Sequence, residues 1–422
     1  MRAYLTSRSP AFANITPPLD RPSFSLNPLW LSHFTATSAI GRGLPQTLAA
    51  LRQRRSGLMP CSFDTVDLAT FIGEVPGVDA VQLPAPLSAF DCRNNRLAFL
   101  GLMQDGFADA VAAAARKYGA HRVGVFLGTS TSGILQTELA YRRRDPANGA
   151  LPANFIYGTT HNTFSVADFT RHYLGLTGPA VVVSSACSSS AKVFASARRM
   201  MAAGLIDAAV VGGVDSLCLT TLYGFNALGL ISSQACRPFD VARDGISIGE
   251  AAAFALLERV PEHLDGNAVL LLGVGESSDA HHMSSPHPEG LGARIAMQQA
   301  LETAQLNAAD MDYINLHGTA TPSNDAAETK AVAALFGSGT PCSSTKGATG
   351  HTLGAAGGLE AVICALALRH GLLPGGLHTQ QPDPALPLNY LLDNREQPIK
   401  RVLSNSFGFG GTNCSLIFGR AG

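Results

Sequence analysis

Short, continuously apolar segments alternate with longer alanine-rich segments along most of the chain. Arg122–Gly128, Pro179–Ser185 and Asp207–Val214 have the length and apolar character of buried strands. Between the last two, Cys187–Ala203 has helical character and ends before Gly204, a residue type that commonly stops a helix. A strand, a helix and a further strand in this order predict a parallel sheet. Because the strands are apolar throughout, we expect helices on both faces of that sheet.

The second half of the chain repeats this alternation. Its predicted strands and helices are, in chain order, Asn267–Gly275, Met311–Leu316, Asp325–Phe336, Leu353–His370, Val402–Asn405 and Cys414–Phe418. The helices that start near Cys187 and near His351 are both rich in small residues, which suits helices packed closely inside a layered protein. We therefore predict an α/β protein of two similar halves, residues 29–265 and 266–422.

The first 28 residues differ from the rest. They contain five prolines and one acidic residue, Asp20, and the folded part is expected to begin with a strand at Leu29–Ala36. An acid-poor start that carries Arg and Ser is typical of a transit peptide, but a tether or an upstream start codon gives the same composition. We expect residues 1–28 to form a flexible N-terminal extension.

Composition narrows the class of protein. The chain has 422 residues, of which 46% are hydrophobic and 14% charged, so a large part must be buried and general disorder is excluded. A formal net charge of −1 argues against nucleic acid as the main partner, since phosphate binding requires a basic surface. No apolar run approaches the ~20 residues of a membrane span. Eight cysteines without a CxxC pair are typical of a reducing compartment, so we expect a cytoplasmic protein with no disulfide framework and no metal site.

Cys187 is the first candidate for chemistry. It lies in SSACSSS, between a predicted strand and a predicted helix. The positive end of the helix dipole would stabilise a thiolate there, and free N–H groups of the first turn could hold an oxyanion. A buried structural cysteine fits the same position equally well, because burial is the commonest fate of a free cysteine.

Two histidines lie in loops of small residues at the ends of predicted elements. His317 begins HGTATP after a strand, and His351 lies in TKGATGHTLGAAGG. Such histidines can orient a substrate and donate a hydrogen bond to a carbonyl, although a lone histidine is more often structural. Thr319 and Thr321 offer hydroxyl groups beside His317, or else form a turn.

Charged and glycine-rich segments complete the candidate site. Lys346 and Glu328 are charged residues close in sequence to the histidines, and they could either tune them or form surface ion pairs. The glycine-rich loop Phe407–Asn413 is not a phosphate loop, because no GK[ST] follows and no helix opens after it. Its glycines permit unusual backbone angles, and two phenylalanines on so flexible a loop suggest a gate.

Taken together, these segments resemble the β-ketoacyl-(acyl-carrier-protein) synthases, and most closely the decarboxylating I/II type. SSACSSS, HGTATPSNDAAE, STKGATGHTLGAAG and NSFGFGGTN occur in the order and spacing of that family, within residues 29–420. The resemblance implies a thiolase-like fold, with two duplicated βαβαβαββ halves stacked in five layers, α-β-α-β-α, usually as a homodimer. It also implies an acyl carrier protein as partner, substrates carried on phosphopantetheine, and no other cofactor.

The resemblance assigns roles to single residues. Cys187 corresponds to the nucleophile that accepts the acyl chain, and His317 and His351 to the pair that handles the malonyl group. Lys346 corresponds to the lysine that supports this pair, with Glu328 as its expected ion partner.

Further correspondences concern the walls of the expected site. Thr319 and Thr321 match residues that bind the pantetheine arm. Phe409 matches the gating phenylalanine, and its N–H is expected to form the oxyanion hole with that of the nucleophile. Phe225 and Thr131 are expected beside the acyl tunnel.

The implied reaction is a decarboxylative Claisen condensation. An acyl thioester and malonyl-acyl-carrier protein would give a 3-oxoacyl-acyl-carrier protein two carbons longer, in fatty acid, polyketide or aryl polyene biosynthesis. The alternative is a chain-length-factor-like partner, the non-catalytic subunit of a heterodimeric synthase, but the complete set of reactive residues argues against it. A thiolase or type III synthase would carry a Cys-His-Cys or Cys-His-Asn set instead.

Two positions depart from the family pattern. Asn324 stands where the threonine motif usually has glycine. Since Asn tolerates the left-handed region better than most residues, we expect a positive φ there. Gly229 stands where an arginine often serves carrier docking, so the docking surface cannot be transferred from the family.

Overall fold

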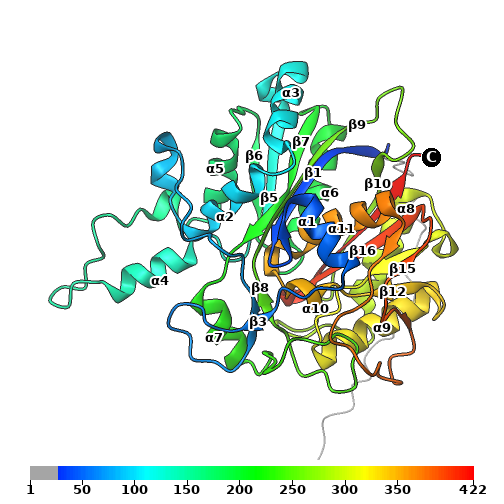
Figure 1. Ribbon diagram of the computed structural model, residues 1–422. Helices are drawn as coiled ribbons and strands as arrows, with labels where there is room; N and C mark the ends of the chain where they lie inside the picture. The colour runs from blue at the N-terminus through cyan, green and yellow to red at the C-terminus, as the bar shows by residue number, and fades with distance from the viewer. Residues whose placement is uncertain (1–26) are drawn as a thin grey trace, which may run out of the picture.

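The computed structural model describes residues 27–422 (Figure 1). Residues 1–26, which make up nearly all of the predicted N-terminal extension, lie outside the described residues. The first element is strand β1 (Leu29–Ser38), which confirms the strand expected at Leu29–Ala36.

Twelve strands form one hydrogen-bonded sheet. Its order from edge to edge is β14 (Asn389–Tyr390), β12 (Pro341–Ser343), β11 (Tyr313–Asn315), β16 (Arg401–Gly408), β17 (Thr412–Arg420), β10 (Val269–Ser278), β1, β9 (Ala251–Arg259), β7 (Ala208–Asp215), β5 (Val123–Gly128) and β6 (Ala180–Val183), with β2 (Gly41–Arg42) beside β1. Two small sheets stand apart from it, β3 (Met59–Pro60) with β4 (Phe71–Gly73) and β8 (Ile248–Gly249), and β13 (Leu372–Leu373) with β15 (Arg395–Glu396).

The large sheet contains one pairing pattern twice. Strand β5 runs parallel to β6 and β7, β7 runs antiparallel to β9, and β9 runs antiparallel to β1. In the same way β11 runs parallel to β12 and β16, β16 antiparallel to β17, and β17 antiparallel to β10. The two units meet where Leu29–Leu31 of β1 pairs with Val269–Leu271 of β10. The predicted duplication is therefore present in the strand topology.

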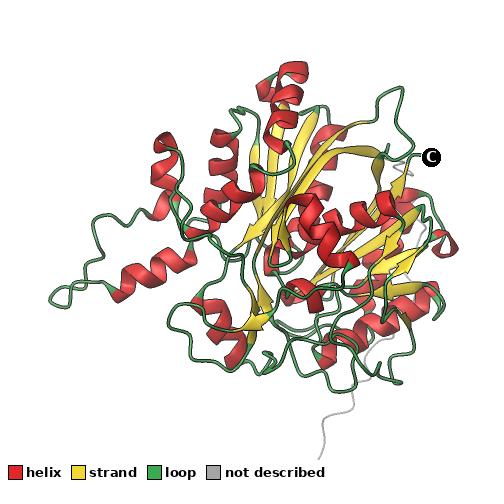
Figure 2. Cartoon of the chain, in the orientation of Figure 1, coloured by secondary structure: helices red, strands yellow, loops and turns green. Residues whose placement is uncertain are grey.

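Helices cover both faces of each unit, as Figure 2 shows. The middle layer consists of α6 (Ser189–Ala202) and α11 (Ala356–His370), which contact each other and both units of the sheet. The outer layers are α2 (Arg93–Leu102), α3 (Phe107–Tyr118) and α5 (Ser165–Tyr173) on one side, and α8 (Leu291–Ala304) and α9 (Pro322–Phe336) on the other. The remaining α-helices are α1 (Gly43–Arg52), α4 (Ile134–Arg142), α7 (Leu219–Ala227) and α10 (Lys346–Thr349). The five layers expected from the resemblance are confirmed.

Strand β9 shows why the sheet is buried on both faces. Ala253 and Ala255 belong to the core that includes α6 and α11, whereas Phe254 and Leu256 belong to the core beneath α2, α3 and α5. Successive residues of a strand point to opposite faces, so a strand between two helical layers must be apolar at every position. This is the continuous apolar pattern seen in the sequence.

One helical segment, Leu353–His370, has the length and hydropathy of a membrane span. It lies inside the protein, where 89% of the stretch is buried. A core helix between two sheet units needs the same apolar composition.

The expectation of a positive φ at Asn324 is wrong. Helix α9 begins at Pro322, with Thr321 as its N-cap, so Asn324 lies in the first turn and is not among the residues with positive φ. The fixed φ of proline suits the first helical position and starts the helix there. The positive φ values of this loop are those of Gly318, 40°, and Ala320, 68°.

A buried ion-pair network anchors α2 to the sheet. The Arg93 side chain, 2% exposed, donates to Glu250 at 3.0 and 2.7 Å and also contacts Asp79 and Glu74. Glu250 in turn accepts the backbone N–H of Leu217 at 2.9 Å. Removing one partner of such a pair leaves an uncompensated buried charge.

We therefore expect Arg93→Ala to lower the free energy of unfolding by about 3–5 kcal/mol. Arg171→Ala, which breaks an i,i+3 surface pair with Asp168, should lower it by less than about 1 kcal/mol. Urea unfolding of both variants beside the unsubstituted protein measures the difference. An equal decrease in the free energy of unfolding for Arg93→Ala and Arg171→Ala would contradict a structural role for the buried Arg93–Glu250 pair.

Candidate active site

Cys187 lies on a tight connection between β6 and α6. The preceding residue, Ala186, has a φ of 52°, which is a strained backbone conformation for a residue with a side chain. The Ser189 hydroxyl stabilises this connection, since it accepts the N–H of Ser185 at 2.9 Å and donates to the carbonyl of Ala186. The Cys187 side chain is 5% exposed and its sulfur faces a pocket.

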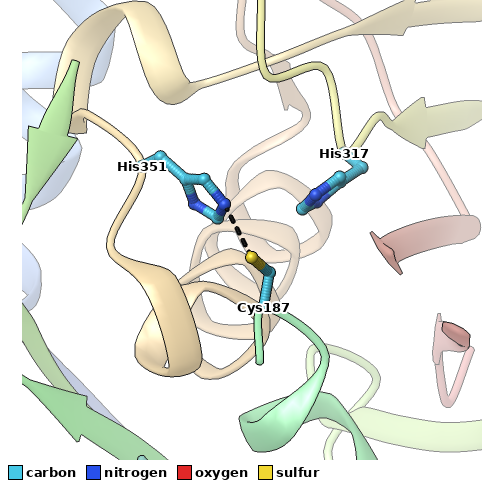
Figure 3. Close-up of side chains that lie close together, drawn as sticks. All are labelled: Cys187, His317 and His351. Atoms are coloured by element: carbon cyan, nitrogen blue, oxygen red, sulfur yellow. Dashed lines mark hydrogen bonds between the residues drawn. The ribbon is translucent and has the colours of Figure 1, made fainter. Parts of the chain in front are cut away.

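The two predicted histidines meet at this sulfur (Figure 3). His317 follows β11, and His351 lies between α10 and α11. Their rings are perpendicular, with centroids 5.3 Å apart. His351 Nε2 lies 3.0 Å from Cys187 Sγ. Three segments far apart in the sequence thus bring their reactive groups to one point.

The contacts assign the proton of His317 to its Nε2 atom. His317 Nδ1 faces the Lys346 ammonium at 3.5 Å, and because an ammonium can only donate, Nδ1 must accept. His351 Nδ1 is buried without a hydrogen-bond partner in the described part of the chain, and His351 Nε2 contacts the sulfur. Burial, together with the positive charge of Lys346, holds the pKa of both imidazoles well below the usual range. Both rings are therefore neutral, and His317 offers the pocket an Nε2–H donor.

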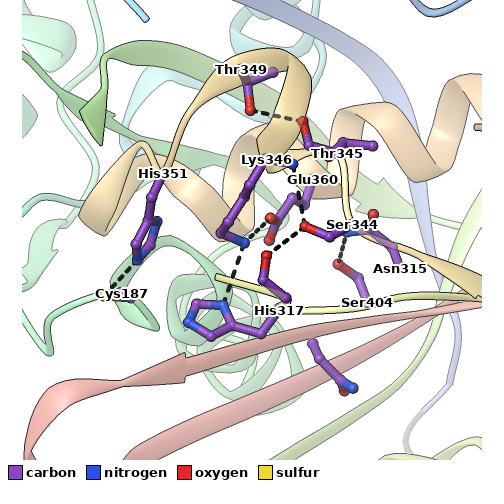
Figure 4. Close-up of polar contacts among 12 residues, drawn as sticks. Cys187, Asn315, His317, Ser344, Thr345, Lys346, Thr349, His351, Glu360 and Ser404 are labelled. Carbon is purple, nitrogen blue, oxygen red and sulfur yellow. Dashed lines mark hydrogen bonds and ion pairs between the residues drawn. The ribbon is translucent and has the colours of Figure 1, made fainter. Parts of the chain in front are cut away.

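Lys346 is paired with Glu360, not with Glu328 (Figure 4). The expected Lys346–Glu328 ion pair is therefore wrong. Glu328 instead accepts the backbone N–H groups of His317 and Gly318, each at 2.8 Å, and the Asn405 side-chain amide at 3.1 Å. Burial raises the pKa of Glu328 to about 7, against the opposing effect of these donors. Its structural role is to hold the backbone that carries His317.

The Cys187 thiol is neutral in the resting enzyme. Burial raises its pKa to about 12, although the charge of Lys346 and the backbone N–H groups of Phe409 and Cys187 act in the opposite direction. The expectation that the helix start would hold a thiolate is therefore wrong for the resting state. Desolvation outweighs the favourable groups, so the proton must leave during the reaction.

The pocket in front of Cys187 has about 600 Å³ of empty space, which includes the solvent at its open end. His317, Thr319 and Thr321 form one wall, and the two threonine hydroxyls lie 2.8 Å apart. Phe225 and Phe409 also line it, with ring centroids 5.5 Å apart. The structure thus brings together most of the residues predicted for the site.

Thr131 is the exception, since it does not line this pocket. Its hydroxyl donates to the buried carboxylate of Asp215 at 2.8 Å, and its backbone N–H does the same. Asp215 also accepts the N–H groups of Ser130 and Gly354, so it joins the ends of β5 and β7 to the segment before α11. In this chain Thr131 orders loops behind the nucleophile.

The glycine-rich loop between β16 and β17 is fastened to a second loop. The Gly410 N–H donates to the Met283 carbonyl at 2.7 Å, and the Asp279 N–H donates to the Gly411 carbonyl at 2.8 Å. The Asn413 amide donates to Asp279 Oδ1 at 3.0 Å. Phe409 is therefore carried by a loop whose position depends on residues 279–283.

Glu360 and Asp279 were not identified from the sequence. Glu360 is the only acidic residue in the apolar segment Leu353–His370, and a lone charge in a core helix predicts a buried partner. Asp279 carries no comparable signal, because its contact with the glycine-rich loop comes from Asn413, 134 positions away.

The thiol and the two imidazoles also form a donor set that a metal ion could use. Their ligand atoms lie within 4.8 Å of one another, and thiolate and imidazole are the ligands that Zn²⁺ prefers. The Lys346 ammonium, 3.5 Å from one of these imidazoles, opposes a cation at this position.

Two family profiles match long segments of the chain. The profile of the β-ketoacyl synthase N-terminal domain matches residues 93–263, and that of the β-ketoacyl synthase C-terminal domain matches residues 268–380. The chain belongs to the β-ketoacyl synthase family. The resemblance inferred from four sequence motifs is thereby confirmed.

Named relatives agree with this assignment. The 3-oxoacyl-(acyl-carrier-protein) synthase 2 of Rhizobium meliloti is 39% identical over 314 residues, which are 70% of this chain and 74% of that protein. The enzyme of the same name from Vibrio cholerae is 32% identical over 409 residues, 91% of this chain and 96% of that protein. Among solved structures, a chain of the ketosynthase ApeO in complex with its chain length factor ApeC, from Xenorhabdus doucetiae, is similar with a TM-score of 0.84. It is 38% identical, over 94% of this chain and 98% of that chain. The predicted thiolase-like fold and the predicted enzyme class, a 3-oxoacyl synthase, are confirmed.

The raised pKa of Cys187 makes a prediction about its reactivity. We expect alkylation of Cys187 by iodoacetamide to be slow at pH 7 and to accelerate on the order of tenfold per pH unit up to pH 10, because the thiolate fraction rises as the pH approaches the pKa. Lys346→Met should slow it further, since the lysine charge lowers that pKa. Peptide mapping of the alkylated protein measures the rate, with the partly exposed Cys61 as internal reference. Rapid alkylation of Cys187 that does not change between pH 7 and 10 would show a preformed thiolate.

Proposed function

We propose that Cys187, His317 and His351 divide the condensation reaction between an acyl acceptor and two hydrogen-bond donors. The observation that carries this proposal is the convergence of one thiol and one nitrogen of each imidazole within 4.8 Å, on a pocket that reaches the surface. Substrates are carried on the phosphopantetheine arm of an acyl carrier protein, and no cofactor enters the scheme.

In the first half-reaction, Cys187 Sγ attacks the carbonyl carbon of an acyl thioester. The carbon–sulfur bond to pantetheine breaks, and the proton of the Cys187 thiol passes to the departing sulfur. The backbone N–H groups of Cys187 and Phe409 both act to lower the pKa of the thiol, which supports the proposal that they form the oxyanion hole. The product is an acyl group on Cys187.

In the second half-reaction, the thioester carbonyl oxygen of malonyl-carrier accepts hydrogen bonds from His317 and His351 Nε2–H. The bond to the carboxylate breaks, CO₂ leaves, and its electron pair forms an enolate that the two donors stabilise. The enolate carbon attacks the acyl carbon, and the bond to Cys187 Sγ breaks. The sulfur takes up one proton, and the carrier leaves with a 3-oxoacyl chain two carbons longer.

These roles predict that the two half-reactions separate by mutation. Cys187→Ala should abolish acyl loading but retain malonyl-carrier decarboxylation, because both imidazole donors remain. His317→Ala and His351→Ala should retain some acyl loading and lose about 10²–10³-fold in decarboxylation, the usual effect of removing one oxyanion donor. CO₂ release from malonyl-carrier and intact-mass analysis of acyl loading, on all three variants, measure the two steps.

Two results would contradict this division of roles. One is a Cys187→Ala protein that folds but does not decarboxylate. The other is a histidine variant that decarboxylates at the unsubstituted rate. The same mass analysis with a panel of acyl carriers identifies which chains prime the enzyme.

Phe409 is proposed to be the gate of the acyl site. Its ring packs on Phe225 across the pocket, so its removal opens that wall without deleting a donor. We expect Phe409→Ala to slow acyl loading more than malonyl decarboxylation, measured in the same two assays. Phe225→Ala removes the other ring of the pair and should act in the same direction. Equal losses in both half-reactions would make Phe409 a purely structural residue.

We further propose that the protein works as a dimer. Strand β6 is at the edge of the sheet, and among the described strands it pairs with β5 alone. Its sequence, AVVV, is apolar, and an uncovered apolar edge strand favours pairing with another chain. The partner is a second copy or, as in the ApeO–ApeC complex, a chain length factor; sedimentation of the purified protein and its activity without a partner distinguish the two.

A role as the non-catalytic partner itself is the second candidate. The thiol and both imidazole donors are present in reacting geometry, which favours the catalytic subunit. A cytoplasmic location and a pathway in fatty acid, polyketide or aryl polyene synthesis complete the proposal. The eight free cysteines support the location.

A further inference from the structure

Asn324 lies in the wall of the active-site pocket. It is 8% exposed and lines the pocket on the same side as Thr319 and Thr321. The preceding residue, Ser323, is exposed and also lines the pocket. Asn324 therefore lies next to the point where the pocket opens to solvent, whereas His317 lines the pocket beside Cys187.

The Asn324 amide has a fixed orientation. Its Nδ2 donates to Asp325 Oδ1 at 3.1 Å, and a carboxylate cannot return a proton to an amide oxygen. Asp325 is itself fully buried, and its other oxygen accepts the N–H of Phe239 at 2.9 Å. This arrangement identifies which end of the amide is nitrogen, so the oxygen must point away from Asp325.

Asn324 Oδ1 is therefore a free acceptor. Within residues 27–422 no hydrogen bond ends on this atom, and it is not sealed from solvent. The hydroxyls of Thr319 and Thr321 are bonded to each other. Asn324 thus offers the pocket a pre-oriented carbonyl oxygen at its outer end.

We propose that Asn324 Oδ1 accepts a hydrogen bond from the outer amide N–H of the phosphopantetheine arm. This inference rests on the proposed function. The arm contains two amide groups, each with one N–H donor, and its sulfur must reach Cys187. The position of Asn324 next to Ser323, which is exposed and lines the pocket, matches the amide farther from the sulfur. Asn324 is then a positioning residue, which aligns carrier-borne thioesters without touching the reacting atoms.

The test is a thermodynamic cycle in which the Asn324 side chain of the enzyme and the outer amide N–H of the substrate are removed separately and together. Acyl-pantetheine is compared with an analogue in which an ester oxygen replaces the outer amide N–H, using acyl loading of Cys187 measured by intact mass. In the unsubstituted enzyme the analogue should have a KM roughly 3- to 10-fold higher, the effect of losing one hydrogen bond. Asn324→Ala should show the same increase with acyl-pantetheine and no further increase with the analogue.

Two controls separate positioning from structure. Acyl-N-acetylcysteamine lacks the outer amide, so Asn324→Ala should load from it at the unsubstituted rate, whereas a structural defect would slow both substrates. Ser323→Ala, on the same wall but exposed, should leave the discrimination between amide and ester intact. If Asn324→Ala does not fold, Asn324→Ser replaces it in the cycle, because the serine hydroxyl is too short to reach the position of Asn324 Oδ1.

The proposal is overturned if the unsubstituted enzyme does not distinguish amide from ester. It is also overturned if the alanine variant distinguishes them equally well, or loses activity equally with all thioesters. An unsubstituted enzyme that loads no acyl group on Cys187 from any thioester would instead contradict the proposed function. The two failures are therefore distinguishable.

Discussion

The close contact of α6 with α11 determines the geometry on which the site depends. A side-chain carbon at Gly357 would lie 2.7 Å from both the N and the Cβ of Ala191, so the two helices touch where neither has a large side chain. Cys187 lies just before α6, and His351 lies shortly before α11. Because the helices pack without spacer side chains, the thiol and the imidazole at their starts come within 3.0 Å. A larger residue at the contact would separate the reacting groups as well as the helices.

The second constraint is a single positive charge inside the protein. Lys346 is fully buried beside His317, and its charge is balanced by Glu360 from α11. Burial, together with this charge, keeps both imidazoles neutral, and the charge opposes the effect of burial on the Cys187 thiol. A buried ion pair of this kind is poor evidence of stability, but here it places a charge that acts on the pKa of all three side chains.

The sequence was sufficient to predict the strands and helices that follow from hydrophobic periodicity. It was not sufficient to predict side-chain contacts between segments that are far apart in the chain. Strands such as β5 and β7 were recognisable because both faces are covered, and Cys187, His317 and His351 because each lies in a distinctive run of small residues. The pairing of Lys346 with Glu360 was missed, since Glu360, 14 residues away, lies in another helix, and the predicted partner Glu328 contacts the His317 backbone instead. The contact of the Thr131 hydroxyl with Asp215 is also long-range, and the positive φ expected at Asn324 was wrong because Pro322 starts the helix earlier than the glycine pattern implied. The pKa of the Cys187 thiol could not be predicted either, because it depends mainly on burial in the folded protein and not on the neighbouring residues in the sequence.

In the proposed mechanism, the resting contact between His351 and Cys187 gives the reaction a preferred order. While the thiol is free, His351 Nε2 is engaged by the sulfur at 3.0 Å, and only His317 has its Nε2 available for a carbonyl oxygen. Acylation turns that sulfur into a thioester, which is a weaker hydrogen-bond acceptor, and so releases the second donor. The pair of N–H groups that stabilises the enolate is therefore complete only after the acyl chain has been loaded. An enolate formed before loading would have no acyl carbon to attack and would be lost to water, so the same 3.0 Å contact that positions the nucleophile also restrains the decarboxylation that would waste malonyl groups.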